Sequence, residues 1–205
     1  MAATHVNVKT LMDEVASSNT YFATAARPNT SFTMAATTFA AGHNGGGAVI
    51  TATTAGAADS GKTVTLTGTD LVGVAQTEVI TLPGSATTTS GTKYFLTVTA
   101  AEMSAQPAAN VSLGFNGSRG MGIFGGRTAL KGFTCASGNT AGDVSFISTS
   151  TLTSSSTAFM KYRTLGTPNT ESHFTAPPLG VLCADGLYVT YTLDVTDQMN
   201  IFYNG

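Results

Sequence analysis

Short runs of alternating β-branched and polar residues cover most of this chain, and the runs are separated by Gly, Asn, Pro and Ser. In "KTVTLTGTD" (Lys62 to Asp70), Val64 and Leu66 would lie on one side of an extended chain and the threonines on the other. "GLYVTYTLDV" (186–195) repeats the pattern. Because side chains of a strand alternate between two faces, these runs predict half-buried β-strands joined by turns.

The runs are regularly spaced, with about six on each side of a glycine-rich stretch. Such spacing is typical of β-sandwiches and small barrels. We therefore predict an all-β protein with two small sandwich- or barrel-like domains, at residues 26–118 and 119–205, preceded by an extended N-terminal arm at residues 1–25. The strands are expected at about 31–39, 48–54, 62–69, 76–82, 93–100, 110–116, 128–136, 143–149, 158–165, 179–184, 186–195 and 199–204.

The arm contains a segment with the features of a helix. "TLMDEVASS" (Thr10 to Ser18) begins with a Thr that can cap a helix. Asp13 and Glu14 follow in the first turns, where the helix dipole favours negative charge. The segment predicts a helix of at most two turns.

Two glycine motifs resemble nucleotide-binding loops. "GAADSGKT" (56–63) fits G-x-x-x-x-G-K-[ST], and "GMGIFG" (120–125) fits G-x-G-x-x-G. Both kinds of site need a helix after the loop, because the helix N-terminus attracts phosphate. Strand-forming residues follow in both cases. We therefore expect no nucleotide binding: the first motif is predicted to be the tip of a hairpin between strands 48–54 and 62–69, and the second a flexible hinge between the domains.

Charged residues make up only 10% of the chain, against about 25% in an average soluble protein. Lys and Arg number 9 and Asp and Glu 11, so we expect no nucleic-acid partner. The sequence has neither a long apolar span nor the pattern of a signal peptide, so we expect no membrane insertion and synthesis in the cytoplasm. A surface so poor in charge favours burial against partners or copies, the alternative being a stable monomer of low charge.

Residues for catalysis or metal binding are sparse. His5, His43 and His173 are far apart in sequence, no G-x-S-x-G motif occurs, and acidic residues are scattered. We therefore expect no enzyme, no catalytic residue, no metal and no cofactor. Cys135 and Cys183 are expected to be buried in strands as small apolar residues, with a disulfide formed after release from the cell as the alternative.

Two stretches resemble a known family. "TVTLTGTDLVGVAQTEVITLPGSATTTSGTKYFLTVTA" (63–100) resembles a β-module of tailed-bacteriophage virion proteins, and "GVLCADGLYVTYTLDVTDQMNIFYNG" (180–205) resembles the terminal hairpin of small phage structural proteins. Together they cover about a third of the chain. The family comprises head decoration and cement proteins. The resemblance implies a non-enzymatic component of the virion that binds the assembled shell.

On this reading the partners are the major capsid protein, copies of the chain itself, or both, and by analogy a trimer fits a quasi-sixfold lattice. A tail, neck or fibre component is the first alternative. A carbohydrate-binding module is the second, with Tyr94, Phe95, Tyr188 or Tyr191 as its aromatic contacts. The candidate partner contacts are Val6, Val8, Leu11, Met12, Gly120, Gly122 and Gly125.

Overall fold

The structure is a computed structural model that describes residues 6–12, 16–40, 46–168, 170–192 and 194–205. These residues form antiparallel β-sheets and, apart from one 3-10 turn, contain no helix. The prediction of an all-β fold is confirmed. The elements are β1 (Asn7–Leu11), β2 (Ser18–Ala26), β3 (Gly47–Thr54), η2 (Ala57–Asp59), β4 (Thr63–Thr69), β5 (Ala75–Thr81), β6 (Thr88–Phe95), β7 (Thr97–Met103), β8 (Val111–Phe124), β9 (Thr128–Ser137), β10 (Ala141–Ile147), β11 (Met160–Leu165), β12 (Glu171–Thr175), β13 (Val181–Cys183), β14 (Leu187–Thr192) and β15 (Thr196–Asn204).

The chain divides into two compact units by its internal contacts. Unit 1 comprises Met1–Val15, Ala41–Gly46 and Ser118–Gly205, and unit 2 comprises Ala16–Ala40 and Gly47–Gly117. The last boundary falls inside β8, one residue from the position expected from the sequence.

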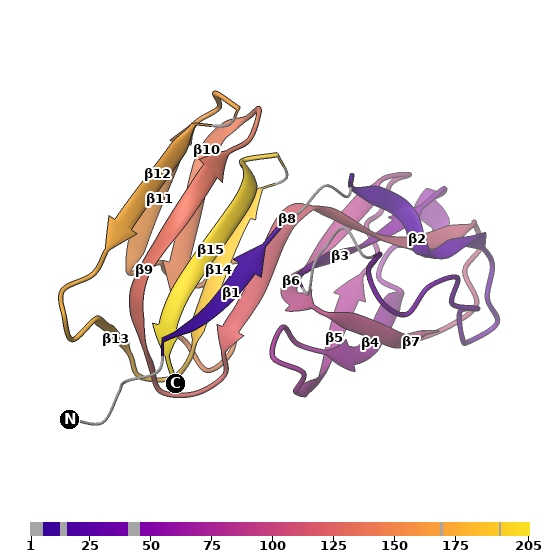
Figure 1. Ribbon diagram of the computed structural model, residues 1–205. Coiled ribbons are helices and arrows are strands. Elements are labelled where there is room, and N and C mark those ends of the chain that lie inside the picture. Colours follow the sequence, from indigo (N-terminus) through magenta and orange to yellow (C-terminus); the bar gives the residue numbers. More distant parts are fainter. Residues whose placement is uncertain (1–5, 13–15, 41–45, 169, 193) are drawn as a thin grey trace. The chain divides into compact units, whose positions relative to one another are not determined.

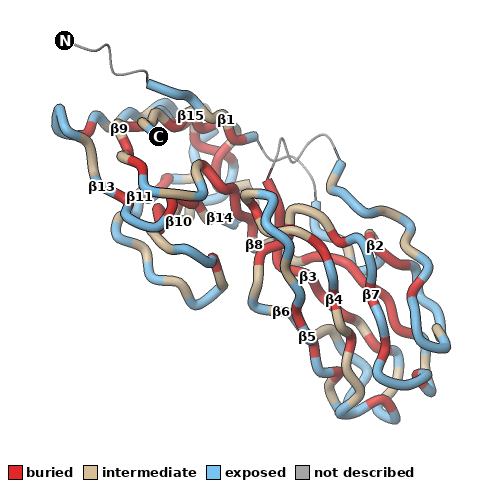
Figure 2. Tube along the Cα trace, turned by 90° about the horizontal axis from the view of Figure 1, so that it is seen from below, coloured by how far each residue is buried: buried red, intermediate tan, exposed pale blue. Residues whose placement is uncertain are grey.

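Unit 1 contains two antiparallel sheets with a shared core. One sheet has the strand order β1-β15-β9-β12, with β13 also paired to β9, and the other contains β11-β10-β14-β8 (Figure 1). Buried and exposed residues alternate along the strands (Figure 2). Phe133 of β9 and Phe146 of β10 stack with ring centroids 4.9 Å apart, and Leu11, Val189 and Ile201 belong to the same buried cluster. Unit 1 is thus a β-sandwich.

Unit 2 contains the three-stranded sheet β5-β4-β7 together with β2, β3, β6 and the first half of β8. Val64 and Leu66 of β4 are fully buried, as the alternating pattern predicts. Ile50 of β3 and Leu113 of β8 are also fully buried. A second group of apolar contacts joins aromatic rings, those of Tyr21, Phe22, Phe39 and Phe115.

Side chains connect β5 to β6, which belong to different sheets of unit 2. Gln76 donates a hydrogen bond of 2.6 Å to the Tyr94 carbonyl. Glu78 Oε1 accepts bonds from the backbone N–H groups of Thr92, at 2.5 Å, and Lys93, at 3.2 Å. All five residues lie in the stretch 63–100. These polar residues therefore have a structural role in unit 2.

The helix predicted from Thr10 to Ser18 is wrong where the structure describes it. Thr10 and Leu11 belong to β1, which pairs with β15, and Ser18 begins β2, which pairs with β8. Asp13 and Glu14 lie outside the described residues. The predicted arm is likewise not a free extension, because β1 and β2 are incorporated into sheets. The partner of β1 lies almost 200 positions away, so the residues around Thr10 do not by themselves indicate that they form a strand.

Three further strand predictions need correction. Residues 31–39 make only isolated bridges, at Ser31 and Thr38, with β7. The run at 93–100 is the junction of β6 and β7. The expected hairpin is also wrong: β3 pairs with β6, whereas β4 pairs with β5 and β7. The short loop after β3 moves the chain from one sheet to another.

Candidate contact surface

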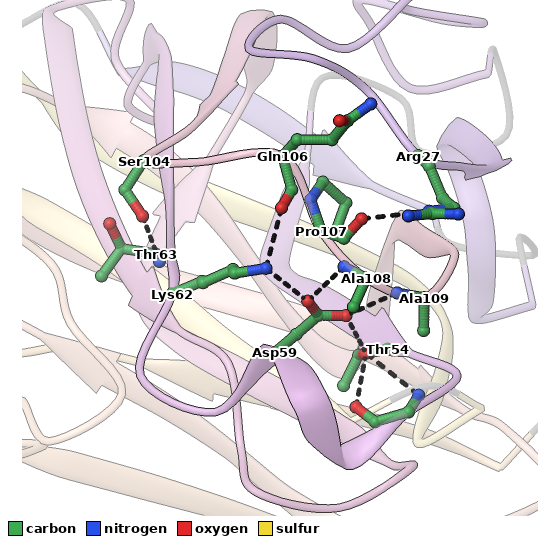
Figure 3. Close-up of polar contacts among 11 residues, drawn as sticks. Arg27, Thr54, Asp59, Lys62, Thr63, Ser104, Gln106, Pro107, Ala108 and Ala109 are labelled. Atoms are coloured by element: carbon green, nitrogen blue, oxygen red, sulfur yellow. Dashed lines mark hydrogen bonds and ion pairs between the residues drawn. The ribbon is translucent and has the colours of Figure 1, made fainter.

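The phosphate-binding pattern at 56–63 forms a loop in which its lysine is already engaged. The 3-10 turn η2 occupies the middle of the loop, and β4 follows directly, with no helix between. Lys62 Nζ lies 2.9 Å from Asp59 Oδ1 and 2.7 Å from the Gln106 carbonyl oxygen (Figure 3). The amine that would hold a phosphate therefore neutralises a carboxylate of the same loop.

Asp59 is fully buried and receives hydrogen bonds on both oxygens. The Ala108 N–H donates to Oδ1 at 2.6 Å, the Ala109 N–H to Oδ2 at 3.0 Å, and the Thr54 hydroxyl to Oδ2 at 3.5 Å. Burial alone would raise the pKa of this carboxyl, but the hydrogen bonds and the charge of Lys62 outweigh it and lower the pKa from 3.8 to about 2. The motif therefore has a structural role: Asp59 and Lys62 join their own loop to the segment at residues 106–109.

The three candidate glycines do not form a hinge. Gly120 and Gly122 lie inside β8, opposite Thr190 and Tyr188 of β14, and both are buried. Gly125 lies in the exposed turn between β8 and β9. This part of β8 is paired with β14 and cannot act as a flexible joint, so the sequence prediction is wrong here. The strand expected after this motif is confirmed as β9.

The four candidates near the N-terminus separate into two groups. Val6, Val8 and Met12 are exposed to 51%, 54% and 39%, whereas Leu11 is completely buried. Alternate residues of β1 face opposite ways, so Val8 lies on the outer face of the five-stranded sheet, and the exposed Val6 and Met12 flank β1 at its two ends. We call Val6, Val8 and Met12 the β1 stripe. Leu11 belongs to the core and is not a candidate contact.

The same outer face carries a hollow of about 310 Å³ over β9. It is lined by Thr134, Cys135, Ala136, Glu171, Ser172, His173, Gln198 and Asn200. These residues come from β9, β12 and β15, which are neighbours in the sheet. Sequence reasoning considered His173 only as a member of a catalytic triad and missed the hollow. Alternation along β12 and β15 could have shown which of their side chains face outward. It could not have shown that these side chains lie next to each other in the sheet.

Metal binding and cysteine chemistry depend on groups among the described residues. They contain no group of three His, Cys, Asp or Glu residues able to hold a metal ion. His5 and His43 lie outside them. Cys135 and Cys183 are buried and unbridged, as expected for core residues, and burial raises the pKa of both thiols.

The aromatic residues proposed for carbohydrate contact are all in the interior. Tyr94, Phe95, Tyr188 and Tyr191 are each exposed to 6% or less. They cannot present a ring to a ligand in this fold, so that assignment of contact residues is wrong.

Comparisons with known proteins provide no relative, since no family model, curated protein or solved structure matches the chain. In the part of the chain that the structure describes, no helix is long and apolar enough to cross a membrane.

Proposed function

We propose that this protein is a non-enzymatic structural component of a tailed-bacteriophage particle, and specifically a decoration or cement protein that binds the assembled shell. The assignment to phage derives from the resemblance of residues 63–100 and 180–205 to virion modules. Binding only the assembled shell would stabilise it by mass action. A tail, neck or fibre position is the alternative within the same particle.

The β1 stripe is the observation that carries the contact part of this proposal. Three apolar side chains stand exposed, one in β1 at position 8 and two directly flanking it at positions 6 and 12, on a protein whose charged residues are only 10% of the total. Fully burying a valine side chain contributes about 1.5–3 kcal/mol, and these valines are about half exposed. Covering Val6 and Val8 would therefore contribute about 2 kcal/mol to binding. The partner is the capsid protein or a second copy of the chain.

A double substitution tests this contact. Val6→Ser with Val8→Ser removes exposed apolar surface without disturbing the buried core, so the protein should fold normally. We expect about 30-fold weaker co-sedimentation with purified shells, which corresponds to about 2 kcal/mol. The matched control is Val74→Ser with Val79→Ser in unit 2, where the valines are 61% and 59% exposed.

Equal binding by the two double variants would refute the contact assignment. Removing residues 1–20 is a poorer test, because the deletion would take away all of β1, including buried Leu11, and the start of β2. A lost interaction would then reflect a damaged core.

The place in the virion is tested separately by quantitative mass spectrometry of purified particles. A copy number comparable to that of the major capsid protein supports the head, and a few copies support the tail, neck or fibres. Absence of the chain from particles would overturn the proposed function.

A further inference from the structure

We propose that the hollow over β9 is a binding site for a neutral, hydroxyl-rich oligosaccharide. The site lies on unit 1, apart from the aromatic residues first considered for that role. It depends on the geometry of three neighbouring strands, β12, β9 and β15, and not on a position in a virion (Figure 1).

The floor of the hollow consists of small residues on the middle strand. Thr134 and Ala136 of β9 face outward, while the neighbouring Phe133 and Cys135 lie in the core. Gly132, two residues before Thr134 on the same strand, has φ of +155°. A Cβ atom there would lie 2.4 Å from the Phe174 carbonyl oxygen, so no larger residue fits.

Longer polar side chains form the two walls. Ala136 pairs with Glu171 of β12 on one side and with Gln198 of β15 on the other. The next outward row places Thr134 between His173 and Asn200. Small residues on the central strand and long ones on its neighbours produce a trough. Its volume of about 310 Å³ is at the lower end of the range for small-ligand sites, about 300–1,000 Å³.

One wall residue is held in place and three are available. Asn200 accepts a bond from the Thr10 hydroxyl at 2.8 Å and donates to Thr134 at 3.3 Å, which fixes its orientation. Within the described part of the chain, Glu171, His173 and Gln198 make no side-chain hydrogen bond or ion pair. They face the hollow from both walls with unused hydrogen-bonding capacity.

The chemistry of the three available side chains, Glu171, His173 and Gln198, indicates the class of ligand. An amide both donates and accepts, a carboxylate accepts, and an imidazole can do either, so the walls match hydroxyl groups, which also do both. Glu171 opposes phosphate and sulfate, and a single carboxylate with one imidazole is too small a set for a metal ion. Phe202 follows Asn200 on the same face of β15, opposite Gly132, and its partly exposed ring can contact the apolar face of a sugar.

Glycan binding by the full chain tests the proposal. The probe is a printed array of neutral and acidic oligosaccharides, followed by calorimetric titration of the strongest neutral sugar. We expect binding to neutral sugars in the micromolar to millimolar range. No binding to any neutral sugar, or binding to sulfated and sialylated glycans alone, would overturn the proposal.

Two variants and a matched control locate the site. Gln198→Ala removes one hydrogen-bonding group and should weaken binding about 3- to 10-fold. Ala136→Phe fills the floor without removing a polar group and should abolish binding. Gln106→Ala makes the same substitution at an exposed glutamine of unit 2 and should leave binding unchanged.

The outcome is read together with thermal unfolding of each variant, which shows whether the fold is intact. Wild-type affinity in a folded Ala136→Phe variant would refute the assignment to the hollow. If that variant does not fold, wild-type affinity in Gln198→Ala refutes it instead. Both results are independent of shell binding, so this proposal and the proposed function can fail separately.

Discussion

Replacing Asp59 by asparagine changes one buried carboxylate into an amide of almost the same shape. The carboxylate accepts from four donors, and both oxygens are used. Asparagine keeps one acceptor oxygen and places an NH₂ group where the other oxygen stood. At least one of the backbone N–H groups of Ala108 and Ala109 would then face a donor, and Lys62 would lose its counter-charge.

The loss of stability can be estimated in two ways. The pKa of Asp59 lies at about 2, below the ordinary 3.8, and each pKa unit corresponds to about 1.4 kcal/mol, so the ionised form is favoured by about 2–3 kcal/mol. Leaving a buried backbone donor unpaired costs about 1–3 kcal/mol. We therefore expect Asp59→Asn to lower the free energy of unfolding by about 2–3 kcal/mol, or Tm by about 5–10 °C.

The dependence on pH separates this electrostatic contribution from a packing defect. Because the folded pKa is below the unfolded pKa of about 3.9, the contribution is fully present above pH 4 and is lost as the pH falls towards 2. The free energies of unfolding of wild type and Asp59→Asn, measured in urea, should differ by about 2–3 kcal/mol at neutral pH and converge near pH 2. If unit 2 unfolds as a separate transition, that transition should be the one affected.

A matched control uses the same substitution at an exposed ion pair. Asp143 and Arg163 are 3.1 Å apart, with side chains exposed to 39% and 68%, so Asp143→Asn should cost less than about 1 kcal/mol. An Asp59→Asn deficit that is equal at pH 7 and pH 2, or no larger than that of Asp143→Asn, would refute the reasoning.

Three other predictions concern packing. Gly91→Ala would place a Cβ atom 2.4 Å from Glu78 Oε2 and should destabilise by about 1–3 kcal/mol in urea unfolding, with most of that cost absent in a Glu78→Ala background. Leu11→Ala should cost about 2–5 kcal/mol by the same measurement, whereas Met12→Ala should cost about 0.5 kcal/mol; similar values would mean that β1 is not part of the core sheet. The two buried cysteine thiols, whose pKa values are raised, should react with a chromogenic disulfide reagent only as fast as the protein unfolds, and rapid native labelling would contradict their burial.

Local patterns in the sequence were sufficient to predict the all-β class and many of the strands. The alternation from Val64 to Thr67 is the burial pattern of β4, and the run that contains Leu187 and Val189 is β14. Pairing was not predictable in the same way, because it depends on residues remote in sequence. The sequence predicts a helix at Leu11 because its strand partner Met199 is remote, and a hinge at the glycines of β8 because β14 comes much later in the chain.

For the candidate surfaces, too, local features were predictable from the sequence and long-range arrangements were not. Val6, Val8 and Met12 could be nominated from sequence as apolar residues in a polar context, and all three are exposed. The hollow could not be nominated, because its lining comes from residues 134–136, 171–173 and 198–200. Only the register of β9 with β12 and β15 brings these short segments together.

The pairing of β1 with β15 also has a consequence for biosynthesis. Thr10 and Asn200 are 190 positions apart, so at about 5–20 residues per second the ribosome needs about 10–40 s after making the first strand to complete its partner. During that interval Leu11 has no finished sheet to enter. Until β15 is made, the nascent chain carries β1 unpaired and Leu11 unburied, and chaperone binding to this segment would protect it against premature aggregation.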